Sequence, residues 1–217
     1  MGYVGVLLLV AVLQYRHAFG LDWLAVGRTQ AGLIRQGQWW RAVTALSLHA
    51  DVAHLASNMV IGGLVGLFVG QLFGSGLAWL SILLAGAAGN LLNALFRPPE
   101  HMSVGASTAV FAALGMSAAY AWKRRQKTPA SWLVRWAPLI GGVALLGYLG
   151  GDGARTDVPA HLMGFFSGVV LGALYGKLGD RVALPTRAQP LLGLIALAVL
   201  GIAWVLAASS SNPHPSP

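Results

Sequence analysis

Residues 52–96 read VAHLASNMVIGGLVGLFVGQLFGSGLAWLSILLAGAAGNLLNALF. This stretch contains no Lys, Arg, Asp or Glu. About 18 or more apolar residues in succession predict a membrane-spanning helix, so the stretch is long enough for two. We expect a tight turn between them at Phe73-Gly74-Ser75-Gly76.

The composition of the whole chain agrees with a membrane protein. Hydrophobic residues make up 56% of the 217 residues and charged residues only 9%, whereas about 25% of residues are charged in an average soluble domain. A soluble domain needs more polar side chains than this to cover its core. Leu191–Ala208 also lacks charged residues and predicts a further span. The predicted fold class is an all-α polytopic membrane protein.

The apolar stretches predict seven helices. They cover approximately Tyr3–Tyr15, Val52–Leu72, Leu77–Phe96, Ser107–Trp122, Leu133–Leu149, Pro159–Tyr175 and Pro190–Ala208. The long segment Arg16–Asp51 is too polar to cross a bilayer but contains several tryptophans, which favour the membrane surface. Met1–Tyr15 lacks the basic start and the cleavage site of a signal peptide. As a span it is short, unless the helix begins upstream of Met1.

Basic residues predict the orientation. One group lies beside helices four and five and another between helices six and seven: Lys123, Arg124, Arg125, Lys127, Arg135, Lys177, Arg181 and Arg187. Since basic loops stay in the cytoplasm, we expect the N-terminus inside and the C-terminus outside. The net charge of +8 is accompanied by no basic stripe or aromatic platform that would indicate nucleic-acid binding. The absence of cysteine excludes a disulfide, a thiolate zinc site and a thiol nucleophile.

Polar residues inside predicted spans are informative, because each one is costly in a bilayer unless it has a role. Four lie at helix starts, namely His54 and Asn58 in helix two, Ser107 in helix four and His161 in helix six. Helices two, four and six run in the same direction when successive spans alternate. These four side chains are therefore expected to converge at one face of the membrane, predicted to be the outer one.

The local spacing of these residues fits a reactive site. His54 and Asn58 are four residues apart and share a helix face. Ser107 follows Gly105-Ala106 at a helix start, where unpaired N–H groups and the positive end of the helix dipole favour negative charge. A predicted length of about 16 residues makes helix four shorter than the hydrocarbon core of about 30 Å. We therefore expect Ser107 below the membrane surface.

Helix six carries small residues in a stripe that continues from His161 through Gly164, Gly168 and Gly172. Small residues at this spacing let two helix backbones approach closely. The counterpart that we expect on helix four consists of Ala106, Ala109, Ala113 and Ser117. This packing would bring His161 to Ser107, with Phe111 beside the imidazole ring.

Each of these features also has a structural explanation. A serine at a helix start is most often a cap. A histidine or asparagine within a membrane often bonds a neighbouring helix, and small-residue stripes occur in ordinary packing. Trp39-Trp40-Arg41 is explained most simply as an interfacial anchor. The coincidence of one serine, two histidines and an asparagine at one depth favours a serine hydrolase, with a Ser–His pair as nucleophile and base.

Together the motifs resemble those of the rhomboid family of intramembrane serine proteases. The matching pieces extend over about Trp39–Gly172 in the family's order and spacing: Trp40-Arg41, His49…His54…Asn58, Gly105-Ala106-Ser107 with Phe111, and Ala160-His161 with Gly164 and Gly168. The resemblance implies a six-helix core within residues 1–189, including an outer loop at 16–51. It makes 190–208 an additional C-terminal transmembrane helix and 209–217 a flexible tail.

The resemblance also implies roles for individual residues. Ser107 would be the nucleophile, His161 the general base, and His54, Asn58 and the Ser107 N–H group the oxyanion donors. The implied supporting residues are His49, Trp40, Arg41, Gly105, Phe111, Gly164 and Gly168. The implied substrates are membrane-anchored proteins cut in a transmembrane segment, at a site open to the outer face of a bacterial plasma membrane. No metal or organic cofactor is implied.

One position departs from the family pattern, which usually reads Gly-x-Ser-Gly. This chain has Gly105-Ala106-Ser107-Thr108. Thr108 is β-branched and carries a hydroxyl, so we expect it to narrow the site or shift its specificity. Since the four implied catalytic and oxyanion residues are present, the departure does not predict inactivation.

Three other functions remain open from the sequence. A catalytically silent relative that binds membrane clients would lack the nucleophile or the base, and both are present. A small transporter or channel would carry ionisable residues deep in several helices, whereas predicted helices three and seven have none. A specialised enzyme that matures one class of surface proteins would share the same site.

Overall fold

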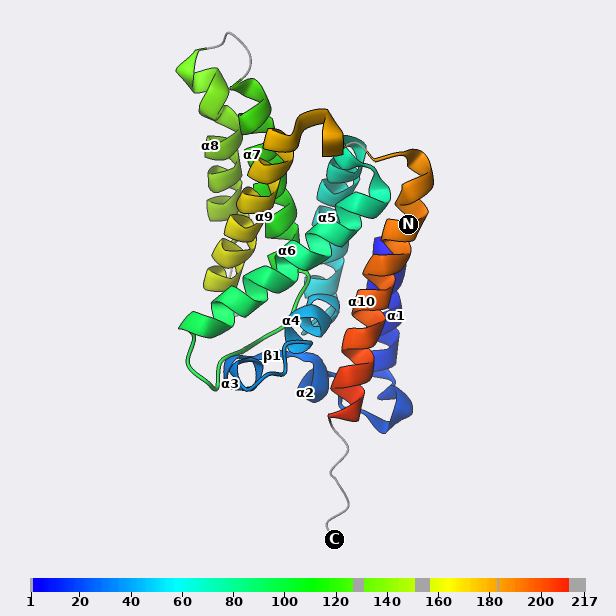
Figure 1. Ribbon diagram of the computed structural model, residues 1–217. Coiled ribbons are helices and arrows are strands. Elements are labelled where there is room, and N and C mark those ends of the chain that lie inside the picture. Colours follow the sequence, from blue (N-terminus) through cyan, green and yellow to red (C-terminus); the bar gives the residue numbers. More distant parts are fainter. Residues whose placement is uncertain (1, 127–130, 151–156, 183, 211–217) are drawn as a thin grey trace.

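The computed structural model describes residues 2–126, 131–150, 157–182 and 184–210. Figure 1 shows a bundle of long helices with a cluster of short elements at one end. The predicted flexible tail at 209–217 falls largely outside the described residues, as does the basic residue Lys127.

Within the described residues the seven predicted helices are confirmed, each ending within one turn of the expected position. They are α1 (Gly2–Tyr15), α5 (Val52–Phe73), α6 (Ser75–Phe96), α7 (Ser107–Arg125), α8 (Trp132–Gly150), α9 (Val158–Leu178) and α10 (Gln189–Ser209). The expected turn between α5 and α6 is made by a single residue, Gly74, whose φ is 84°. A positive φ of this kind is readily adopted only by glycine.

Four helices in the described part of the chain are long and apolar enough to cross a membrane: Val52–Phe73, Ser75–Phe96, Val158–Leu178 and a helix that includes α10, Thr186–Ser209. The apolar helix α1 and the apolar segment Trp132–Leu145 of α8 are shorter than these four helices. The central helix α7 is rich in alanine and ends in three basic residues. It contacts α5, α6, α8 and α9, so most of its surface faces protein instead of lipid.

The segment between α1 and α5 folds into short elements: η1 (Ala18–Gly20), α2 (Trp23–Gly27), β1 (Thr29–Gln30), α3 (Ala31–Arg35), α4 (Arg41–Thr44) and η2 (Ala45–Ser47). β1 pairs antiparallel with β2 (Met102–Ser103), which lies in the connection between α6 and α7. The Thr29 hydroxyl donates to the Ser103 carbonyl oxygen at 2.9 Å and accepts from the Ser103 N–H, also at 2.9 Å. The 16–51 segment therefore holds the chain that leads into α7.

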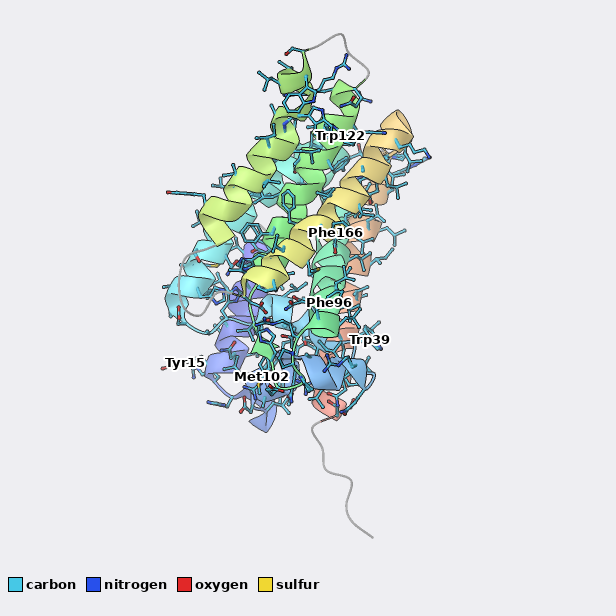
Figure 2. All side chains as sticks on the ribbon, turned by 90° about the vertical axis from the view of Figure 1, so that its left-hand side faces the viewer. Tyr15, Trp39, Phe96, Met102, Trp122 and Phe166 are labelled. Atoms are coloured by element: carbon cyan, nitrogen blue, oxygen red, sulfur yellow. The ribbon has the colours of Figure 1, made fainter. Side chains whose placement is uncertain are left out.

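The N-terminal ends of α5, α7 and α9 lie at the same end of the bundle, as the parity of the helices predicts (Figure 1). The short elements of the 16–51 segment gather there. In Figure 2 the labelled residues Tyr15, Met102 and Trp39 mark this end, and Trp122 marks the opposite one. The remaining short helices η3 (Gly179–Val182) and η4 (Thr186–Ala188) connect α9 to α10.

The glycine stripe of α9 packs against α7, but not against the predicted counterpart. A Cβ atom built on Gly164, Gly168 or Gly172 would overlap the backbone carbonyl of Thr108, Ala112 or Met116 respectively. Ala109 instead faces Gly86 of α6, and Ala113 belongs to the main apolar cluster. The face of α7 that contacts α9 is therefore displaced by about one residue from the predicted face. Glycines let the α9 backbone pack directly on carbonyl groups of α7. A sequence pattern of small side chains does not indicate which carbonyl groups these are.

This packing predicts different effects for the same mutation at two glycines. Gly168→Ala adds one methyl group that meets the Ala112 backbone, so it should destabilise the protein by about 1–3 kcal/mol, the usual range for overpacking. Gly193→Ala adds the same group where nothing lies within 4 Å. It should be neutral or stabilising by up to about 1 kcal/mol, because alanine favours helix. Thermal melting of both variants in one detergent checks this, and equal melting temperatures would contradict the packing.

Candidate active site

Ser107 lies at the first residue of α7 and contacts the histidine that was expected beside it. Its Oγ atom is 2.8 Å from Nε2 of His161, a hydrogen-bond distance. The two residues come from different helices, α7 and α9, and meet because both helices begin at the same end of the bundle.

The imidazole of His161 is enclosed by protein. His161 is 6% exposed, and its ring centroid is 4.4 Å from that of Phe111, which lies one turn into α7. The packing predicted for Phe111 is therefore present. An aromatic neighbour of this kind restricts the ring of His161 to the orientation that directs Nε2 at Ser107.

Gly105 is needed for the shape of the chain that enters α7. Its φ is 132°, a value that favours glycine, and its N–H donates to the Ala45 carbonyl oxygen at 3.0 Å. A Cβ atom at this position would lie 2.7 Å from Nε2 of His54 and 3.5 Å from Oγ of Ser107. The glycine thus leaves room for the His54 ring next to Ser107.

His54 and Asn58 occupy the first two turns of α5. The Asp51 carboxylate caps this helix by accepting the His54 N–H at 2.8 Å. The Asn58 side-chain amide donates one hydrogen to the His54 carbonyl oxygen at 3.0 Å, which leaves its second hydrogen for another acceptor. Both residues line the same cavity as Ser107 and His161.

This cavity has a volume of about 860 Å³. It is lined by the first turns of α5, α7 and α9 and by the connection between α6 and α7. Polar side chains converge there, although lipid-facing side chains such as Leu64 and Phe166 are exposed on the outer surfaces of the same helices. A cavity with convergent polar groups in an apolar scaffold is the usual form of a catalytic or binding site.

The supporting residues on the 16–51 segment make structural contacts. Arg41 is buried, and its guanidinium donates to the carbonyl oxygens of Ala25 and Arg28, each at 3.0 Å. Trp40 packs against the main apolar cluster. His49 is 4% exposed and contacts His54 edge-on at 5.1 Å. Burial, together with the nearby His54, lowers the pKa of His49 to about 4, so this histidine is neutral at pH 7.

Thr108, which lies where the resemblance predicts a glycine, is buried between two helices. It is 4% exposed, and its methyl group lies close to Gly89 of α6 and Gly164 of α9. These two glycines provide the space that a β-branched residue needs. Thr108 also lines the cavity, next to Ser107.

Sequence reasoning missed a polar cluster on the α9 side of the cavity. The Asp157 carboxylate accepts from Nε2 of His101 at 2.7 Å and from the Asn93 amide at 2.9 Å. It also caps α9 by accepting the Ala160 N–H at 3.3 Å. Burial raises the pKa of Asp157, but the hydrogen bonds that the carboxylate accepts from His101 and from the Ala160 N–H outweigh it, so the pKa is lowered. An aspartate just before Val158-Pro159 is a helix-start signal, whereas His101 lies in a loop whose position depends on the tertiary fold.

Comparison with known proteins gives a consistent assignment. The Rhomboid domain family model matches residues 36–178, a range that contains every cavity residue named above. Rhomboid protease GluP of Bacillus subtilis is 41% identical over 92 residues, which cover 42% of this chain and 18% of that protein. Rhomboid-like protease 3 of Toxoplasma gondii is 33% identical over 154 residues, covering 71% of this chain and 58% of that protein.

RHOMBOID-like protein 7 of Arabidopsis thaliana is 31% identical over 151 residues, covering 65% of this chain and 44% of that protein. The chain therefore spans less than two thirds of the length of each of these relatives. No solved structure gives a significant match. Because the family model covers well over half of the chain and includes the whole cavity, the chain belongs to the rhomboid family.

Proposed function

We propose that this chain is an intramembrane serine endopeptidase that cleaves transmembrane segments of membrane-anchored proteins. The observation that carries the proposal is the 2.8 Å contact between Ser107 Oγ and His161 Nε2 in a polar cavity of an otherwise apolar helix bundle. The proposal is also supported by two relatives whose names describe proteases.

In the proposed reaction His161 is the general base and Ser107 the nucleophile. Nε2 of His161 accepts the hydroxyl proton as Oγ attacks the scissile carbonyl carbon. The imidazolium then donates this proton to the leaving amine, and an acyl-enzyme remains on Ser107. Water repeats the sequence in the second half: it loses a proton to His161, attacks the ester and releases the carboxylic acid and the Ser107 hydroxyl.

The oxyanion of the tetrahedral intermediate has three proposed donors. They are the His54 imidazole, the unused amide hydrogen of Asn58, and the backbone N–H of Ser107. The N–H groups in the first turn of α7 have no partner within the helix, and the dipole of α7 favours negative charge there. Donors fixed before the reaction stabilise the intermediate without reorganisation.

The proposed location is the plasma membrane of a bacterium, with the cavity open to the outer face. The proposed orientation rests on the basic residues at the far end of α7, Lys123, Arg124 and Arg125, and on Lys177 near the end of α9. These residues lie at the opposite end of the bundle from Ser107, so a cytoplasmic position for them directs the cavity outward. In this proposal residues 1–189 form the catalytic domain, and α10 is an addition that packs against α6 and α4.

The dyad predicts that Ser107→Ala and His161→Ala each reduce cleavage of a transmembrane substrate in proteoliposomes by more than about 10³-fold. The double variant should be no worse than either single one, because the two groups act as a unit. Ser117→Ala is the matched control: this serine lies on the same helix and its hydroxyl bonds the Ala113 carbonyl oxygen. Cleavage by Ser107→Ala at a rate near that of Ser117→Ala would exclude the proposed nucleophile. Absence of cleavage by wild type and by Ser117→Ala would instead favour a catalytically silent relative that binds membrane clients.

The oxyanion donors predict a smaller effect that appears in the rate constant. His54→Ala and Asn58→Ala should each lower kcat about 10²–10³-fold and change KM little, since these bonds strengthen only in the transition state. Gln71→Ala, an exposed polar residue near the opposite end of α5, is the control. Wild-type kcat in both His54→Ala and Asn58→Ala would show that these residues serve packing alone.

A further inference from the structure

The polar cluster beside the cavity forms a chain of hydrogen bonds with a fixed direction. Arg97 donates from Nη2 to Nδ1 of His101 at 3.1 Å. Because a guanidinium can only donate, Nδ1 of His101 is the acceptor and its Nε2 carries a hydrogen. That hydrogen is donated to Oδ2 of Asp157 at 2.7 Å, and Oδ1 of the same carboxylate caps α9.

The backbone around His101 is itself held by the 16–51 segment. The Ala31 N–H donates to the His101 carbonyl oxygen at 3.0 Å, and the Gly32 N–H donates to the Pro99 carbonyl oxygen at 2.9 Å. Arg35 donates to the carbonyl oxygen of Arg97 at 2.8 Å. The connection between α6 and α7 is therefore attached on one side to α3 and on the other to Asp157.

Asp157 belongs to the turn that carries His161. The His161 N–H donates to the Asp157 carbonyl oxygen at 3.1 Å, and the Asp157 side chain is only 10% exposed. Any displacement of Asp157 moves the first turn of α9 and the imidazole with it. Glycines at 164, 168 and 172 fix the rest of α9 against α7, but they lie beyond His161 and leave its first turn to be fixed by the cap.

We propose that Arg97, His101 and Asp157 are positioning residues that hold the first turn of α9, and hence Nε2 of His161, in hydrogen-bonding distance of Ser107. This inference rests on the proposed function. Both oxygens of the Asp157 carboxylate are used in this positioning. Oδ1 caps α9, and Oδ2 accepts hydrogen bonds from His101 and Asn93, which anchor the carboxylate. An ordinary helix cap needs only the hydrogen bond to Oδ1.

The test separates the cap from the anchor. Asp157→Asn retains an oxygen that can cap α9, but its amide hydrogens face the donors of His101 and Asn93. We expect kcat for a transmembrane substrate to fall about 10- to 100-fold with little change in KM, since a misplacement of about 1 Å can cost 10²-fold in rate. Asp22→Asn is the matched control, because Asp22 caps α2 through the Ala25 N–H at 2.9 Å and does not line the cavity. Its kcat should equal that of wild type.

Conservative replacement of His101 provides a second measurement. His101→Gln can still donate a hydrogen to Asp157 and should keep most of the activity, whereas His101→Leu cannot donate and should behave like Asp157→Asn. Melting temperatures measured in the same detergent show that each variant is folded at the assay temperature. The inference is overturned if Asp157→Asn retains wild-type kcat, if KM rises in place of a fall in kcat, or if the Gln and Leu variants are equally impaired.

Wild type and Ser107→Ala belong in the same assay. If Ser107→Ala cleaves like wild type, or if neither cleaves, the proposed function fails, and the positioning role of Arg97, His101 and Asp157 fails with it. If wild type cleaves, Ser107→Ala does not, and Asp157→Asn has the kcat of wild type, only the positioning role is refuted.

Discussion

The direct contact between the backbones of α7 and α9 is the constraint on which the site depends. Ser107 and His161 can meet only if the two helix axes are closer than ordinary side chains allow. Gly164, Gly168 and Gly172 satisfy this condition, because carbonyl groups of α7 occupy the positions where their Cβ atoms would be. The missing side chains of Gly164 and Gly89 also leave space for the methyl group of Thr108. Helix packing and side-chain chemistry are thus determined by the same residues.

A polar cavity within an apolar bundle needs walls that fix each polar group. The 16–51 segment holds the part of the wall formed by the α6–α7 connection, since β1 pairs with β2 and the Ala45 carbonyl oxygen accepts the Gly105 N–H. Arg41 stabilises the segment from within by bonding carbonyl groups at the end of α2. Buried polar groups that are fully bonded rigidify a site, whereas unpaired ones destabilise it. The 16–51 segment and the α6–α7 connection therefore act together as the scaffold for both the Ser107 and the His161 ends of the cavity.

The fold was largely predictable because apolar runs of bilayer length are visible in the sequence and the direction of each helix follows from its place in the count. The same parity placed Ser107 and His161 at one end of the bundle, and their contact was predicted from the glycine stripe of α9. The face of α7 that meets α9 was not predictable, since backbone carbonyls, and not small side chains, receive the glycines. The Arg97–His101–Asp157 chain was missed for a related reason: Asp157 lies more than fifty positions from His101 in sequence, and only the tertiary fold of the α6–α7 connection brings them together. Local sequence patterns predict helices well, but they do not predict contacts between a loop and a helix that is distant in sequence.

The central claim is that His161 activates Ser107 as a nucleophile. It is tested most directly by reacting the purified protein in detergent with a fluorophosphonate, which phosphonylates activated serines, and locating the adduct by mass spectrometry. The account predicts one adduct, on Ser107, that forms in wild type and in Ser117→Ala but not in Ser107→Ala, and that forms far more slowly in His161→Ala. Labelling of Ser107 at the same rate with and without His161, or no labelling of a folded wild-type protein that also fails to cleave, would contradict it.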